Sequence, residues 1–295
     1  MDTFKTRPGS SEELLITEEN FTNKTKKQFP YVMKENGKNV YKAICPACDN
    51  PIRIVGLYKR EEDVKRKPYG RHTPSDLPGL TVYNEEDYLN CPYHNPNQSN
   101  NQSNDGAKRR PGDKKSSWIY DLMKEHFDLI ISILEKSLHI YISYYFAETL
   151  LQNWKNNEGW RYYHTNYNNL SYMLLYAEKS YRIFGQLIRK DSNVEKAILE
   201  KGKNFQLEDI GMNYYHKIKQ KDGFLDAVFY LTNHQLKRHG EHTEEIYKYC
   251  IIEGEKEIYK EKIIVEKGRL YKLIQQQQSR SNREERLIEI ANRVL

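Results

Sequence analysis

Residues 40–48 read Val40-Tyr41-Lys42-Ala43-Ile44-Cys45-Pro46-Ala47-Cys48 and begin a segment, residues 40–96, that holds three of the chain's four cysteines. The segment contains two short knuckles, Cys45-Pro46-Ala47-Cys48 and Cys91-Pro92-Tyr93-His94. Each knuckle places two metal-binding side chains three positions apart, and together they supply the four ligands that tetrahedral Zn²⁺ requires. The sequence therefore predicts one zinc ion per chain, held by Cys45, Cys48, Cys91 and His94.

The residues on either side of the first knuckle favour β-strands. Residues 40–44 and 52–58 are rich in β-branched and aromatic side chains, and Pro46 restricts φ as a tight turn requires. The order strand, Cys-x2-Cys, strand and then a distant second ligand pair resembles the zinc-ribbon class of small metal-stabilised domains. The resemblance is at the superfamily level, covers about the first third of the chain, and implies a small zinc-dependent fold.

This segment departs from the zinc-ribbon pattern in two ways. The fourth ligand is His94 rather than a cysteine, and residues 49–90 separate the ligand pairs by more than the usual roughly 15–20 residues. The alternative is that the cysteines are buried, reduced thiols and His94 is a surface residue. If a metal is bound, we expect its role to be structural, because four protein ligands leave no open position for a substrate.

The composition points to a soluble, cytoplasmic protein with no membrane segment. No run of 18 apolar residues exists, and the N-terminus lacks the apolar region of a signal peptide. Four cysteines, three of them in a metal pattern, do not form a disulfide scaffold. The abundance of Lys, Asn, Ile and Tyr is typical of an AT-rich, microbial genome.

A basic insert lies between the knuckles. Tyr58 and Tyr69 accompany six cations, as a surface that binds phosphates and stacks on bases requires: Lys59, Arg60, Lys65, Arg66, Lys67 and Arg71. One alternative is a solvated basic loop, with Tyr69 packed on the zinc module. A weaker alternative is a catalytic site between two domains that uses Arg71, His72 and Asp76.

The chain divides into four parts by composition. Residues 1–39 form a polar, partly disordered segment, and residues 40–96 form the zinc module with its insert. Residues 97–116 form a polar and basic linker, because they contain too few apolar residues to offset the entropy of ordering. Residues 117–295 form a mainly helical domain. The expected fold class is α+β: a small zinc-ribbon-like domain, then a helical domain with a short β-hairpin near the C-terminus.

Apolar periodicity predicts the helices of the second domain. Residues 118–154 form a long helix capped by Ser116 or Ser117, and residues 166–190 form a second helix antiparallel to it. Further helices are expected at residues 193–201, 207–219 and 223–237, and a terminal helix follows Asn282. Residues 245–252 and 262–266 are expected to be strands, with a turn near Gly254.

Two functions are compatible with these observations. The first is a zinc-stabilised nucleic-acid-binding protein that contacts DNA or RNA. The second is a protein-interaction or regulatory module, in which zinc supports a small domain and the helices contact a protein partner. Enzymatic activity has no support, because the phosphate-binding, dinucleotide-binding, hydrolase and metalloprotease motifs are all absent. The sequence leaves the oligomeric state open.

Overall fold

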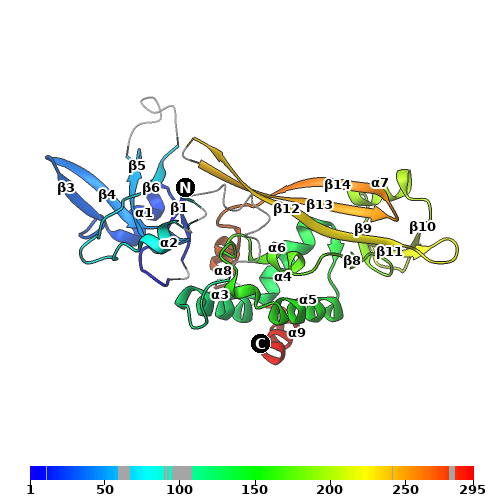
Figure 1. The fold of residues 1–295 in the computed structure, drawn as a ribbon. Helices are drawn as coiled ribbons and strands as arrows, with labels where there is room; N and C mark the ends of the chain where they lie inside the picture. Colours follow the sequence, from blue (N-terminus) through cyan, green and yellow to red (C-terminus); the bar gives the residue numbers. More distant parts are fainter. Residues whose placement is uncertain are drawn as a thin grey trace.

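The computed structural model describes residues 1–295 except residues 11, 59–66, 90, 92, 95–107, 241 and 279–282. The described chain forms two parts, each with its own hydrophobic cluster (Figure 1). We refer to residues 1–94 as the N-terminal module and to residues 108–295 as the C-terminal unit. Within the described residues, no helix combines the length and the apolar character needed to cross a membrane.

A four-stranded antiparallel sheet forms the centre of the N-terminal module. Its strands, in spatial order, are β3 (Val32–Glu35), β4 (Lys38–Ile44), β5 (Pro51–Val55) and β6 (Tyr69–His72). Asn36 and Gly37 both have positive φ, 51° and 75°, as a tight two-residue hairpin turn requires. Strands β4 and β5 confirm the two strands predicted beside the first knuckle, although β5 ends at Val55.

Side chains alternate between the two faces of the sheet. One face is buried; the opposite face, here called the solvent face, is exposed at Arg53 and Arg71 but covered at Val40 and Ile44. The buried face carries Ala43, Ile52, Ile54 and Gly70. The first residues of the chain belong to the same core, which differs from the partly disordered segment expected there. Strands β1 (Thr3–Phe4) and β2 (Leu14–Leu15) and helix α1 (Glu18–Thr25) contribute buried side chains to it.

The C-terminal unit begins with three helices where the sequence predicted one: α3 (Lys114–Glu125), α4 (Phe127–Leu138) and α5 (Tyr144–Asn156). Asp113, rather than a serine, caps α3 by accepting a hydrogen bond from the backbone N–H of Ser116 at 2.9 Å. The helix breaks at His126, and α4 ends at His139, whose φ of 56° is left-handed. Apolar periodicity continues across the break at His126, so it concealed that break.

The prediction of a mainly helical second domain is wrong, because two four-stranded sheets occupy much of the C-terminal unit. One sheet has the order β14-β13-β12-β8, and the other has the order β10-β11-β9-β7. The strands of the first are β8 (Tyr181–Arg182), β12 (Ala227–His239), β13 (His242–Glu253) and β14 (Lys256–Ile264). Those of the second are β7 (Ile140–Tyr141), β9 (Leu187–Arg189), β10 (Phe205–Asp209) and β11 (Tyr215–Gln220). The fold is therefore mixed, with strands dominant.

Three helices predicted from the sequence do not form as expected. Residues 207–219 and 223–237 are largely strand, and of residues 166–190 only α6 (Leu170–Tyr176) is α-helical. Burial alternates along the start of β12, where Ala227, Phe229 and Leu231 are buried and the residues between them are not. Within the predicted helix 207–219, Lys219 of β11 instead pairs across strands with Glu208 of β10 at 3.5 Å.

Other predictions for this unit are confirmed. Strands β13 and β14 form the expected hairpin, and Gly254 turns it with a φ of 57°. Helix α7 (Asn193–Lys201) has the predicted bounds, and α9 (Glu285–Val294) is the terminal helix. A further helix, α8 (Arg269–Gln278), was not predicted from the sequence.

A buried carboxylate joins the two parts of the chain. Glu13 is 3% exposed, and its Oε1 accepts hydrogen bonds from Thr3 Oγ1 at 2.7 Å, Asn168 Nδ2 at 2.7 Å and Tyr93 OH at 3.3 Å. Asn168 also accepts a hydrogen bond from the backbone N–H of Gly268 at 2.8 Å. Burial raises the pKa of Glu13, although the hydrogen bonds from Thr3 and Asn168 oppose this change. Glu13 therefore makes the contact between the parts sensitive to protonation.

Replacing Glu13 by glutamine is expected to remove one pH-dependent contribution to stability. The folded chain holds the Glu13 proton more tightly than the unfolded chain, so wild type loses this contribution as pH rises above about 4.3, the ordinary glutamate pKa. Glutamine retains the accepting carbonyl oxygen without the charge. The stability of Glu13→Gln relative to wild type should therefore increase from pH 4 to 8, as measured by urea unfolding. Glu178→Gln is an exposed control, and a flat difference for Glu13→Gln would contradict this account.

Candidate metal centre

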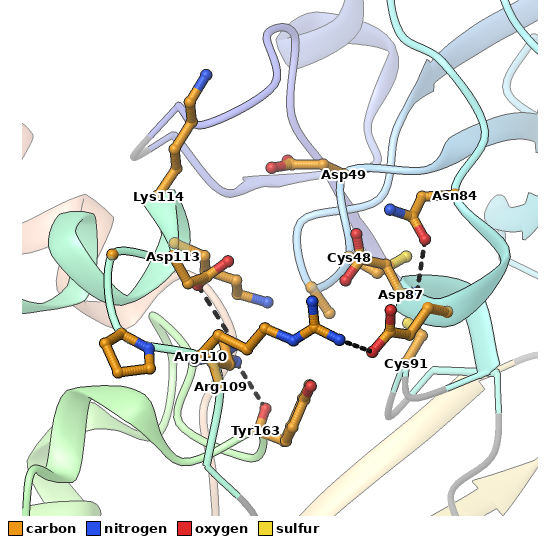
Figure 2. A pocket seen from close by; sticks show the side chains of 15 residues that line it. Cys48, Asp49, Asn84, Asp87, Cys91, Arg109, Arg110, Asp113, Lys114 and Tyr163 are labelled. Atoms are coloured by element: carbon orange, nitrogen blue, oxygen red, sulfur yellow. Dashed lines mark hydrogen bonds and ion pairs between the residues drawn. The ribbon is translucent and has the colours of Figure 1, made fainter.

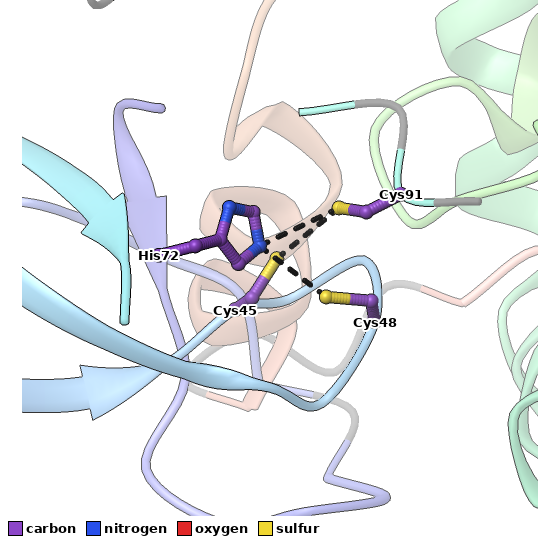
Figure 3. Close-up of side chains that lie close together, drawn as sticks. All are labelled: Cys45, Cys48, His72 and Cys91. Atoms are coloured by element: carbon purple, nitrogen blue, oxygen red, sulfur yellow. Dashed lines mark hydrogen bonds between the residues drawn. The ribbon is translucent and has the colours of Figure 1, made fainter. Parts of the chain in front are cut away.

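The structure brings together the three knuckle cysteines and His72 (Figure 3). Cys45 directly follows β4, and Cys48 lies in the turn before β5. His72 is the last residue of β6, and Cys91 follows helix α2 (Glu85–Leu89). Their ligand atoms all lie within 4.8 Å of one another. This group can hold one metal ion.

The turn after β4 directs both of its cysteines to the same point. The backbone N–H of Cys45 donates to Asn50 O at 2.8 Å, and the N–H of Asp49 donates to Cys45 O at 3.1 Å. Asp49 adopts a left-handed φ of 60°, and its carboxylate forms an ion pair with the buried Lys5. Asn50 Nδ2 lies 3.4 Å from Cys48 Sγ, as in the hydrogen bonds that orient metal ligands.

The separations between ligand atoms match a tetrahedral site. Zn–S bonds of about 2.3 Å and Zn–N bonds of about 2.05 Å at tetrahedral angles imply about 3.8 Å between two sulfurs and about 3.6 Å between sulfur and nitrogen. Cys45 Sγ and Cys91 Sγ are 3.7 Å apart. His72 Nε2 lies 3.3 Å from Cys48 Sγ and 3.6 Å from Cys91 Sγ. These three separations are close to those of a tetrahedrally coordinated ion, and all four ligand atoms lie within 4.8 Å of one another.

The buried thiols also interact electrostatically with one another. Burial opposes ionisation of Cys45, but hydrogen bonds from Cys48 and Cys91 outweigh it and hold the pKa of Cys45 well below its ordinary value. Burial and the neighbouring Cys45 raise the pKa of Cys91 well above its ordinary value. A metal cation reverses this second effect, because thiolates are stable as ligands of a dication.

The structure places His72, rather than the expected His94, in the fourth position. The His94 ring stacks on Tyr88, with centroids 3.7 Å apart and planes inclined by 28°, and lies 6.3 Å from the His72 ring. The short spacing of Cys91 and His94 suggested a ligand pair, but it does not show which histidine faces the sulfurs. The alternation of side chains along a strand was the available signal for His72. His72 lies two residues after Gly70, so both residues lie on the same face of β6.

A cavity of about 480 Å³ adjoins the metal centre (Figure 2). Cys48 and Cys91 line one side, and Arg109, Asp113 and Lys115 line another. Arg109 was expected in a flexible linker, but it is 6% exposed and donates to Tyr163 O at 2.8 Å. Burial, followed by the charge of Arg109, lowers the pKa of Lys115 to about 8. Three thiolates around a dication carry net charge −1, which these cations would offset.

The predicted nucleic-acid residues occupy different environments. Lys59, Arg60, Lys65 and Arg66 lie outside the described residues, whereas Lys67 and Arg71 are exposed. The Tyr58 hydroxyl lies 2.8 Å from Thr22 Oγ1, and Lys27 Nζ lies 4.2 Å from the centre of its ring. Tyr69 lies on the solvent face of β6, with its ring 6.2 Å from that of His242.

Comparison of the chain with protein-family models, with curated proteins and with solved structures finds no match.

Proposed function

We propose that this chain is a zinc-stabilised nucleic-acid-binding protein whose contact surface is the solvent face of the β3–β6 sheet. A row of basic side chains across three adjacent strands carries this proposal. Lys42 on β4 pairs in register with Arg53 on β5, and Arg53 pairs with Arg71 on β6. Adjacent strands lie about 4.8 Å apart, so the row concentrates positive charge along one line across the sheet.

The charge of this row is only partly neutralised. Glu35 Oε1 lies 2.8 Å from Lys42 Nζ, and Glu35 Oε2 lies 3.8 Å from Arg53 NH1. The Arg53 side chain is half exposed at 50%, and Arg71 forms no ion pair with the described residues. Arg53 and Arg71 are therefore the cations best placed to contact phosphates.

Tyr69 is the better candidate of the two tyrosines for stacking on a base. It lies two residues before Arg71 on the same face of the sheet. The Tyr58 ring is instead occupied by Lys27 and by Tyr41, whose centroid is 4.8 Å away. Lys59, Arg60, Lys65 and Arg66 lie outside the described residues, and we propose them as further phosphate contacts from their sequence alone.

Zinc is the proposed ion of the metal centre. Three thiolates and one imidazole in a tetrahedral arrangement are typical of structural zinc sites, and four protein ligands leave no coordination position for a substrate. In the proposed protein the ion stabilises the small module, and the sheet makes the contact.

Replacing both Arg53 and Arg71 by alanine is expected to weaken nucleic-acid binding mainly at low salt. Two lost phosphate contacts reduce the slope of log K against log salt by about 1.8 for duplex DNA or about 1.4 for single strands. Fluorescence anisotropy with labelled oligonucleotides between 50 and 200 mM salt measures this slope.

The control removes two exposed lysines of the C-terminal unit, Lys179 and Lys196, which changes the net charge equally. A slope that falls equally in both variants would indicate a nonspecific charge effect and contradict the proposed surface. Absence of wild-type binding to DNA and RNA at 50 mM salt would overturn the function and favour a protein-interaction module.

A further inference from the structure

A second cavity, of about 550 Å³, lies between the N-terminal module and helices α3 and α8. Its lining contains three carboxylates, three large aromatic rings and no lysine or arginine: Glu12, Asp121, Glu125, Trp118, Tyr167 and Tyr271, together with Leu122, His126, Ile274 and Gln275. Cavities of this size at the boundary between two parts of a chain are common ligand sites.

Two of the aromatic rings that line the cavity, here called the aromatic wall, stack on one another. Trp118 and Tyr167 are nearly parallel, with planes inclined by 6° and centroids 6.0 Å apart. The faces of such rings carry partial negative charge and attract cations. The wall therefore favours a ligand with positive charge and apolar surface.

Tyr167 lines the cavity with a side chain that makes no hydrogen bond with the described residues. Its residue is 3% exposed, but its hydroxyl is not among the buried, unpaired polar atoms of the described chain, so the hydroxyl is accessible at the cavity. Burial, followed by the nearby charge of Glu13, raises the pKa of Tyr167.

The carboxylates at the edge of the cavity are also incompletely paired. Asp121 and Glu125 are four residues apart on α3, where like charges repel and destabilise a helix. Glu12 forms an ion pair with Lys24, but Asp121 has no ion-pair partner in the described part of the chain. A bound cation would relieve the repulsion between Asp121 and Glu125.

We propose that this cavity binds a small organic cation, an ammonium or guanidinium ion with an apolar body, against Trp118 and Tyr167. Asp121 and Glu125 provide the countercharge, and the Tyr167 hydroxyl accepts a hydrogen bond when the cation carries an N–H. This site is independent of the proposed nucleic-acid surface, which lies on the β3–β6 sheet.

Calorimetric titration of the full chain with choline, agmatine and 3,3-dimethylbutan-1-ol tests the site. The alcohol has the shape of choline without its charge, so choline should bind at least about fivefold more tightly, as a cation–π contact with partial desolvation implies. Agmatine binding with little choline binding would assign the site to guanidinium ions. Absence of binding by both cations, or equal affinity of choline and the alcohol, would overturn the proposal.

The matched variants are Asp121→Asn with Glu125→Gln, and Glu178→Gln with Glu289→Gln. Both pairs remove two exposed negative charges, but only the first lines the cavity. The first pair should reduce cation affinity severalfold and leave the unfolding temperature within a few degrees of wild type. A Trp118→Phe variant keeps the core packed and should lose the ligand-induced shift of one indole resonance. Equal affinity in both carboxylate pairs would refute the site.

Discussion

Replacement of His72 by alanine is expected to abolish stoichiometric zinc binding, whereas replacement of His94 is expected to preserve it. His72 Nε2 lies 3.3 and 3.6 Å from two of the cysteine sulfurs, and His94 instead stacks on Tyr88. Loss of an outer-sphere partner typically costs about 10–100-fold in metal affinity, so loss of a ligand should cost more. Plasma-emission analysis and competition with a chelator measure the stoichiometry and the affinity.

The replacement of His72 by alanine should also unfold the N-terminal module. Its hydrophobic cluster includes all three metal-binding cysteines, and small domains of this kind commonly depend on metal for folding. Apparent free energies of structural zinc binding reach about 10–16 kcal/mol at neutral pH. Chelation of wild-type protein should have the same effect, and zinc should dissociate as pH falls because the thiolates must regain protons.

Two results would contradict this account of the metal centre. Full zinc content in His72→Ala with loss of zinc in His94→Ala would restore the ligand set suggested by the sequence. Zinc well below one per chain in untagged wild type would remove the zinc proposal itself. Cys48→Ser serves as the positive control, because both ligand sets include that residue.

Replacement of Trp154 by alanine is expected to cost about 3–5 kcal/mol of stability, as for other large buried aromatic residues. Trp154 on α5 is 0% exposed and packs against Trp160, with ring centroids 5.3 Å apart. A typical domain has only about 5–15 kcal/mol in total, so the C-terminal unit should lose a large part of its stability. Far-UV circular dichroism during urea unfolding measures the change.

Tyr145→Ala on the same helix is the matched control, because Tyr145 is 82% exposed. It should change stability by no more than about 0.5 kcal/mol, as is usual for surface positions. Zinc content should remain unchanged in both variants, since the metal centre belongs to the other hydrophobic cluster. Equal effects of the two substitutions on stability would show that the face of α5 that carries Trp154 is not buried.

The C-terminal unit shows where sequence periodicity was insufficient. Apolar side chains at intervals of three and four favoured helices in residues 207–219 and 223–237, but those residues lie largely in β10, β11 and β12. A strand and a helix can both satisfy a short apolar pattern, and pairing with a distant strand decides between them. Strand β12 pairs with β13 over most of its length, a partner that local sequence does not reveal.

The sequence by itself determined the local features of the metal module: the two knuckles, strands β4 and β5, and three of the four residues in the cysteine–histidine group. These depend on residue type and on spacings of a few positions, which the chain encodes directly. Only the tertiary structure decided that His72 joins the group, that Lys42, Arg53 and Arg71 form one row, and that Trp118 and Tyr167 form one wall. These juxtapositions depend on strand register and on packing between segments far apart in the chain, which local propensity does not specify.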